Sequence, residues 1–339
     1  MFIKRSYSFP AMIKWSKKGF VIGAIISTVI VLFYKFFHFQ WLALPTLPIS
    51  LIGIALAFYL GFKNNASYDR LWEARKVWGA IVNYSRSFGS MVTSYVANGE
   101  AAETTSFAEL QGYKSKLIKT HLAWLAALRF QLITKRKWEH DADAYYAGMH
   151  KMLFEKENIG SMEDEVRHFL SDEQFSIIKT KSNWATQILT LQSENIKTLK
   201  TKNIINENSQ VSMVEMVGKI YDEQGKCERI KNFPFPRQYA TVTLYFICLF
   251  ALIMPCGLIK EMKAFGENYV WLVIPLGTII TWVFVVMEMI GDYSENPFEG
   301  SYNDTPIFNI SRNIEIDLLE MIGEKDIPKP ITEHDGFLI

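Results

Sequence analysis

Residues that could do acid–base or metal chemistry are scattered through the 339-residue chain. The six histidines form no HExxH pattern, and the three cysteines form no CxxC pair. The nearest approach to a cluster is His140 with Asp141 and Asp143, on a polar stretch that we interpret as solvated surface. The sequence also contains no phosphate-binding glycine loop and no GxSxG motif. We therefore predict that the protein is not an enzyme and has no metal site.

The composition indicates apolar segments beside a large polar part. Hydrophobic residues make up 49% of the chain, aromatic residues 14% and charged residues 21%. The 36 basic and 35 acidic side chains leave a net charge of +1, which argues against a nucleic-acid partner. The aromatic content excludes low-complexity disorder, because these side chains bury too much surface.

Four apolar segments are long enough to cross a bilayer, namely residues 19–39, 45–62, 239–259 and 269–290. A helix of about 20 residues covers roughly 30 Å, the thickness of the hydrocarbon core. Four such segments in one chain favour transmembrane helices over core helices of a soluble protein.

The charges that flank these segments predict their orientation. Residues 1–18 contain no acid and five bases, Lys4, Arg5, Lys14, Lys17 and Lys18. Bases also follow the second span, whereas residues 40–46 are uncharged and residues 260–268 are balanced. Because positive charge is retained on the cytoplasmic side, we expect an inner-membrane protein with three cytosolic parts, residues 1–18, 63–238 and 291–339.

The middle segment, residues 63–238, has the periodicity of helices. Apolar residues recur at spacings of three and four between Phe107 and Leu128 and again between Ile177 and Leu199. Strand signals are nearly absent. We predict an all-helical cytosolic domain with breaks near 97–105, 158–161 and 203–210 and at Pro234 and Pro236.

The second span carries two stripes of side chains at helical spacing. The bulky stripe is Ile54, Phe58 and Phe62, and the small stripe is Gly53, Ala57 and Gly61. No helix-breaking glycine or proline directly follows the second span, so we expect the helix to continue into the cytosolic segment. Small residues let helix backbones approach closely, so the small stripe suits packing on a copy of the helix around an axis. Ordinary packing inside a four-helix monomer fits the spacing equally well.

Charged residues gather where the second and fourth spans reach the cytoplasm. Acids follow one face of the fourth span, at Glu288, Asp292 and Glu295, and Arg70 and Arg75 lie past the second span. Acids at a membrane boundary usually pair or face water. We predict ion pairs that tie the two spans together; an ion-attracting vestibule is the alternative.

Three stretches of the chain resemble the most characteristic motifs of the bestrophin family of ion channels. They are FKNNASYDRLWEARKVWG at 62–79, CERIKNFPFPRQYA at 227–240 and ENPFEG at 295–300. The order of parts also agrees: two spans, a helical insert, two spans and a tail. The resemblance covers about residues 1–310 and is to a short prokaryotic member.

The resemblance implies an all-α membrane protein that assembles as a homopentamer around one central pore. The second-span helices would line a narrow neck, with Ile54, Phe58 and Phe62 carried over by position. A second, cytosolic constriction of one aliphatic residue falls on Ile205, with Ile204 as the alternative. The implied partners are further copies of the chain, membrane lipid and small monovalent ions.

In animal members, the asparagine-proline-phenylalanine motif precedes an acidic run that clasps calcium. Residues 295–304 read ENPFEGSYND here, with Glu299 and Asp304 as the acids after the motif. Calcium takes six to eight oxygen ligands, so we expect neither calcium nor another cofactor.

Since the animal members of the family are chloride channels, the resemblance implies a channel for chloride or other anions. Rings of isoleucine and phenylalanine offer no ligand that replaces hydration water, so a narrow apolar neck acts as a gate by dewetting. Aromatic edges favour anions and aromatic faces favour cations, so a sodium-selective channel of the same fold stays open. A membrane-anchored scaffold that does not conduct is a further alternative.

Overall fold

The computed structural model describes residues 1–97, 99–140, 152–157, 159–301 and 303–339. Within these ranges the chain is helical, as predicted, and isolated β-bridges join Phe337 to Phe2 and to His334. The chain forms two compact units. The polar unit comprises Met1–Ile3, Trp72–Phe233 and Pro297–Ile339, and the apolar unit comprises Lys4–Leu71 and Pro234–Asn296.

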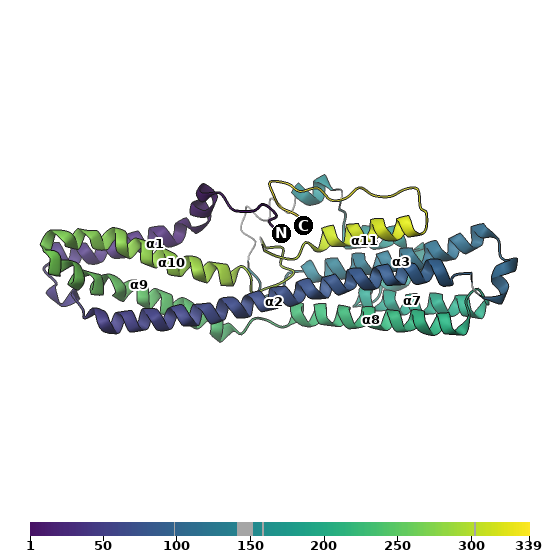
Figure 1. Cartoon of the computed structure of the whole chain (residues 1–339), viewed down its shortest axis with the longest axis horizontal. Helices are drawn as coiled ribbons and strands as arrows, with labels where there is room; N and C mark the ends of the chain where they lie inside the picture. Colours follow the sequence, from purple (N-terminus) through teal and green to yellow (C-terminus); the bar gives the residue numbers. More distant parts are fainter. Residues whose placement is uncertain (98, 141–151, 158, 302) are drawn as a thin grey trace. The chain divides into compact units, whose positions relative to one another are not determined.

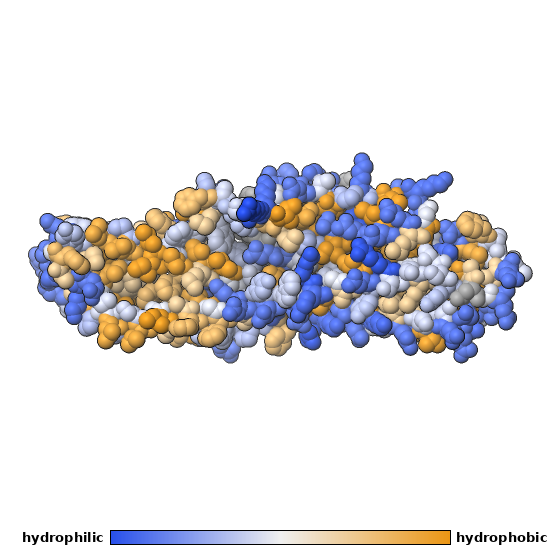
Figure 2. Space-filling view, viewed as in Figure 1, coloured by the Kyte–Doolittle hydropathy of each residue, from blue (hydrophilic) through white to orange (hydrophobic). Residues whose placement is uncertain are grey.

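The apolar unit contains the four segments that are long and apolar enough to cross a membrane, which confirms that prediction. Short 3-10 helices connect the first of these segments to the second and the third to the fourth, and Figure 2 shows hydrophobic side chains gathered over this unit. In chain order (Figure 1) the elements are α1 (Phe9–Phe36), η1 (Gln40–Leu42), α2 (Thr46–Tyr95), α9 (Arg237–Phe265), η3 (Glu267–Leu272) and α10 (Val273–Asp292).

Small residues on one face of α1 let it pack closely on α10. A Cβ atom added at Gly19 would lie 2.6 Å from a methyl carbon of Val285, and one added at Gly23 would lie 3.1 Å from the Thr278 carbonyl oxygen. The buried residues of α1 recur every three or four positions: Ser16, Gly19, Gly23, Ser27, Val31 and Tyr34. Helical periodicity therefore leaves the opposite face of α1 exposed.

Charges at the far end of α1 are paired. Lys35 Nζ lies 2.9 Å from Glu267 Oε2, and Lys263 Nζ lies 3.4 Å from Glu267 Oε1. The Tyr34 hydroxyl donates to the same carboxylate at 3.5 Å. Glu267, in the connection between α9 and α10, thus neutralises Lys35 and Lys263.

The polar unit is built on the second part of α2, a helix that runs without interruption for 50 residues. This confirms the prediction that the second span continues beyond the apolar segment. The other helices of the unit are η2 (Glu100–Thr104), α3 (Phe107–Ile133), α5 (Met162–Phe169), α6 (Asp172–Lys179), α7 (Trp184–Thr201), α8 (Glu207–Asn232) and α11 (Ile307–Met321).

N-cap side chains explain where these helices begin. Ser106, Ser161, Ser171, Asn183 and Asn206 each accept a hydrogen bond from the backbone N–H three residues later. The predicted breaks near 97–105 and 203–210 fall close to helix ends, and α8 ends just before the prolines. The breaks before α6 and before α7 were not predicted, and the second interrupts the periodicity expected over residues 177–199.

The core of the polar unit contains a buried histidine. His121 on α3 is fully buried, its Nε2 lies 2.9 Å from the Ser85 hydroxyl, and its ring stacks on Phe88 with centroids 5.4 Å apart. Burial lowers the pKa of His121 to about 3. This imidazole is therefore neutral near pH 7.

Candidate functional site

The bulky stripe of α2 is exposed although its side chains are strongly apolar. Ile54, Phe58 and Phe62 are 55%, 67% and 61% exposed, respectively. The opposite face of α2 supplies Leu56 and Leu60 to a core shared with α9. The three stripe residues thus share one outward face, as their spacing predicts, and that face is free to meet lipid, a pore or another chain.

The small stripe beside it does not behave as a unit. Gly53 is buried, and a Cβ atom there would lie 2.9 Å from the Phe250 ring on α9 of the same chain. Ala57 and Gly61 are half-buried, and a Cβ atom at Gly61 would meet nothing within 4 Å. Gly53 therefore serves packing within one chain, which is the second of the two alternatives that the spacing allows.

A buried ion pair joins α2 to α10 immediately after the bulky stripe. Lys63 Nζ pairs with Glu288 Oε1, and the lysine is completely buried while the glutamate is 9% exposed. Beside this pair, at Asn64 after Lys63 and at Met287 before Glu288, the Asn64 side-chain amide donates to the Met287 carbonyl oxygen at 3.0 Å. An ion pair and a side-chain hydrogen bond therefore fix α2 against α10 at this level.

Lys63 was not among the residues predicted for this contact, which were Arg70 and Arg75. Assigning Glu288 to either arginine is wrong, since Lys63 holds the carboxylate. Arg70 is half-buried further along α2, and Arg75 belongs to the polar unit. A signal for Lys63 was present, because it follows the buried Leu60 by three residues and so lies on the buried face.

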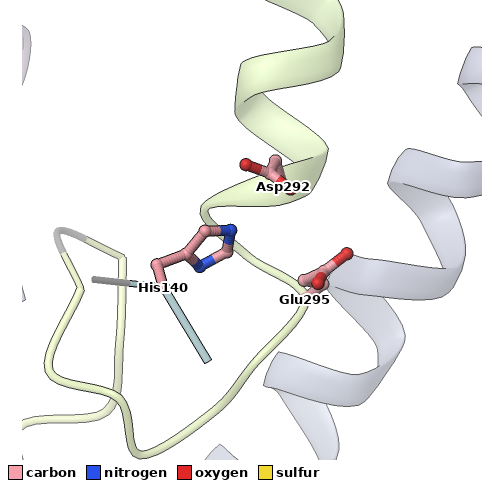
Figure 3. A group of neighbouring side chains, drawn as sticks. All are labelled: His140, Asp292 and Glu295. Carbon is pink, nitrogen blue, oxygen red and sulfur yellow. The ribbon is translucent and has the colours of Figure 1, made fainter. Parts of the chain in front are cut away.

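Two further acids lie at the end of α10, and Figure 3 shows Asp292 in the last turn and Glu295 beyond it. Glu295 is completely buried, and its Oε1 lies 3.1 Å from Nη2 of Arg237, the first residue of α9. Glu288 and Glu295 therefore take part in ion pairs, with partners from α2 and α9 respectively.

Figure 3 also draws His140, which belongs to the polar unit. Its Nδ1 lies 2.9 Å from Glu299 Oε1 of the same unit, and its side chain is half-buried. His140 is therefore a hydrogen-bonded group, which corrects its interpretation as solvated surface. Asp141 and Asp143 lie outside the described residues.

The two residues predicted for the cytosolic constriction are buried inside the polar unit. Ile205 is 1% exposed and Ile204 is 3% exposed, and both belong to the core of the polar unit. The Ile204 carbonyl oxygen accepts a hydrogen bond from Gly99 N–H at 3.0 Å, which anchors this turn against the segment after α2. Neither side chain reaches a surface where it could line a passage.

The loop after α10 is organised by the carboxylate of Asp304, which is buried. Its Oδ1 accepts backbone N–H groups from Phe298 at 3.0 Å and Thr305 at 2.7 Å, and its Oδ2 accepts from Gly300 at 2.7 Å. Both oxygens are thus engaged by the loop's own backbone.

A lysine lies where this loop presents a carbonyl. Lys231 Nζ donates to the Phe298 carbonyl oxygen at 3.3 Å and lies 2.5 Å from Glu139 Oε1, with both side chains buried. Calcium would need six to eight oxygens in this region. The Asp304 carboxylate and the Phe298 carbonyl therefore already have protein donors.

Four membrane-length helices, an exposed aromatic stripe on one of them and ion pairs at the stripe's end define a helical membrane protein. The sequence model of the bacterial and fungal bestrophin proteins matches residues 16–320. The chain therefore belongs to the bestrophin family.

Curated relatives agree with this assignment. The Escherichia coli K12 protein YneE is 26% identical over 284 residues, which cover 84% of this chain and 79% of that protein. The Ralstonia nicotianae protein RSc3414 is 28% identical over 298 residues, covering 86% and 83%. Both are named voltage-dependent anion channel-forming proteins.

Solved structures share the fold. The crystal structure of a bacterial bestrophin homologue from Klebsiella pneumoniae, determined by zinc phasing, superposes with a TM-score of 0.74 at 21% identity. The match covers 91% of this chain and 98% of that one. At this identity the similarity concerns the fold alone.

Proposed function

We propose that the protein is a bestrophin-type channel that passes chloride and other small anions through a pore lined by α2. The observation that carries the proposal is the exposed stripe of Ile54, Phe58 and Phe62, which turns away from the chain's own core. The relatives named as anion channel-forming proteins support anions as the permeant class.

In this proposal, five copies assemble around one axis and present three rings of apolar side chains. Such rings offer no ligand to an ion that loses its hydration water, so a narrow neck excludes ions by dewetting until it widens. The edges of Phe58 and Phe62 carry the positive end of the ring quadrupole, which favours anions when the edges face the pore. We further propose that both chain ends and the polar unit lie in the cytoplasm of a cell with this protein in its inner membrane.

Calcium has no part in the proposed gate. The loop around Asp304 is held by three backbone N–H groups and by Lys231, so we expect it to keep this conformation without a bound cation. Channel current is therefore expected to be the same with calcium and with a calcium chelator.

Planar-bilayer recording of the purified protein under a salt gradient tests the function. A reversal potential close to the equilibrium potential of chloride supports the proposal. A reversal potential close to that of sodium would mean that this fold conducts cations here. Absence of current from an intact oligomer favours a scaffold.

Alanine variants test the neck. Phe58→Ala and Ile54→Ala widen the rings, so we expect a larger conductance or open fraction, and Phe62→Ala should show the smallest effect. The matched control is Ile52→Ala, since Ile52 is also exposed but lies on another face of α2. Unchanged current in Phe58→Ala, with the oligomer intact, would assign the stripe to lipid or to a neighbouring chain.

A further inference from the structure

The first turns of α1 carry three lysines on one exposed face. Lys14, Lys17 and Lys18 are spaced by three and four residues, which places them side by side on the helix, and all three are exposed. The preceding segment adds exposed Lys4 and Arg5, and residues 1–18 contain no acid. The start of α1 is therefore a concentrated positive surface.

This lysine face continues directly into the apolar surface of α1. Val21, Ile25 and Val29 follow Lys18 at spacings of three and four, and they are 51%, 58% and 43% exposed. The opposite, small-residue face of α1 packs on α10, which fixes the rotation of the helix. A molecule lying along this exposed face would meet lysines at one end and aliphatic side chains along the rest.

Aromatic residues lie at the same level of the apolar unit. Trp15 packs against Tyr293 with ring centroids 5.8 Å apart, and Phe20 meets Trp282 edge-on at 6.4 Å. The indole N–H of Trp282 donates to the Ser16 hydroxyl at 2.9 Å. Tryptophan and tyrosine gather at the depth of lipid headgroups, so this layer marks where α1 meets the membrane surface.

The two ends of α1 differ in how their lysines are neutralised. Lys18 and Lys35 are separated by 17 residues, or about 26 Å of helix, close to the thickness of a bilayer core. Lys35 is paired with Glu267. Among the described residues, Lys14, Lys17 and Lys18 have no carboxylate within ion-pair distance. Their ammonium groups are therefore open to a counter-charge that the described part of the chain does not supply.

We propose that Lys14, Lys17 and Lys18 bind the phosphate groups of anionic phospholipid, whose acyl chains lie along Val21, Ile25 and Val29. The inference rests on the membrane-spanning role of α1 and not on which ion the protein conducts. Ammonium groups near a membrane surface attract anionic headgroups, and each lysine adds about a fivefold preference. The lysine face therefore selects lipids by headgroup charge at the point where α1 enters the bilayer.

The test uses the purified full chain in dodecyl maltoside with phosphatidylglycerol or phosphatidylcholine added. Native mass spectrometry counts retained lipids, and melting temperature measures lipid stabilisation. We expect the protein to retain phosphatidylglycerol in preference to phosphatidylcholine, and the preference to weaken as salt is raised. The triple variant Lys14→Gln, Lys17→Gln, Lys18→Gln should lose up to about 100-fold of the preference.

Two matched triples keep the result interpretable. Replacing the exposed polar-unit lysines Lys181, Lys197 and Lys219 with glutamine removes the same charge and should leave the preference unchanged. Arginine at positions 14, 17 and 18 keeps the charge and should also preserve it. The proposal would be overturned if the glutamine triple kept the lipid preference of the parent, or if the control triple lost as much of it. It would also be overturned if inorganic phosphate raised the melting temperature as much as phosphatidylglycerol does. None of these readouts depends on ion flux.

Discussion

Removing one partner of the Lys63–Glu288 pair should destabilise the protein far more than removing both. Lys63 is completely buried and Glu288 nearly so, so either charge left alone is desolvated without compensation. Breaking a buried pair costs about 3–5 kcal/mol, whereas an apolar pair of similar volume is often neutral or stabilising. We expect Lys63→Met and Glu288→Leu each to lower the free energy of unfolding by about 3–5 kcal/mol, and the double variant to recover most of it.

The assay is a double-mutant cycle, with unfolding followed in detergent by circular dichroism. The expected coupling energy is at least about 3 kcal/mol, because the two single losses share one interaction. The matched control is the ion pair of Arg229 with Glu73, whose side chains are 64% and 41% exposed. Exposed pairs contribute about 0–1 kcal/mol, so the same cycle there should give little coupling.

A coupling below about 1 kcal/mol at Lys63 and Glu288 would refute the reasoning, because it would mean that water reaches the pair. Equal coupling in the control pair would refute it too, since burial would then not be the cause.

Two further predictions concern single positions in the two units. The folded pKa of His121, about 3, lies below the unfolded value of about 6.5, so its contribution to stability is present above pH 6.5 and is lost as pH falls toward 3. The difference in the free energy of unfolding between the parent and His121→Gln should therefore fall by about 2 kcal/mol from pH 7.5 to pH 5. If this difference stays the same at both pH values, the ring is hydrated. Gly53→Val should cost about 1–3 kcal/mol, because its Cβ would meet the Phe250 ring at 2.9 Å. Gly61→Val, with open space around its Cβ, is the control in the same melting experiment.

Helical periodicity explains why the apolar helices and the bulky stripe were predictable. Ile54, Phe58 and Phe62 share a face because of their spacing alone, and the uninterrupted α2 follows from the lack of a breaking residue after the second span. These properties belong to one helix, so no knowledge of neighbouring elements is needed.

Contacts between elements were harder to predict. Glu288 had four basic candidates within one stretch of α2, and only the packing of α10 on the Leu60 face selects Lys63. Ile204 and Ile205 lie in a turn whose direction is set by hydrogen bonds to Gly99 and its neighbours, about a hundred residues earlier in the chain. Local patterns carry no information about either partner.

The continuity of α2 restricts how its sequence can change in length. Each residue of a helix turns the following side chains by about 100°, so one residue inserted after Gly61 would rotate Lys63 away from Glu288. The same insertion would change the register of every later residue of α2 against the residues before it. Substitutions on the exposed face leave that register intact. Among homologous chains, gaps should therefore gather in the turns around η1 and η2 and avoid the 50 residues between them.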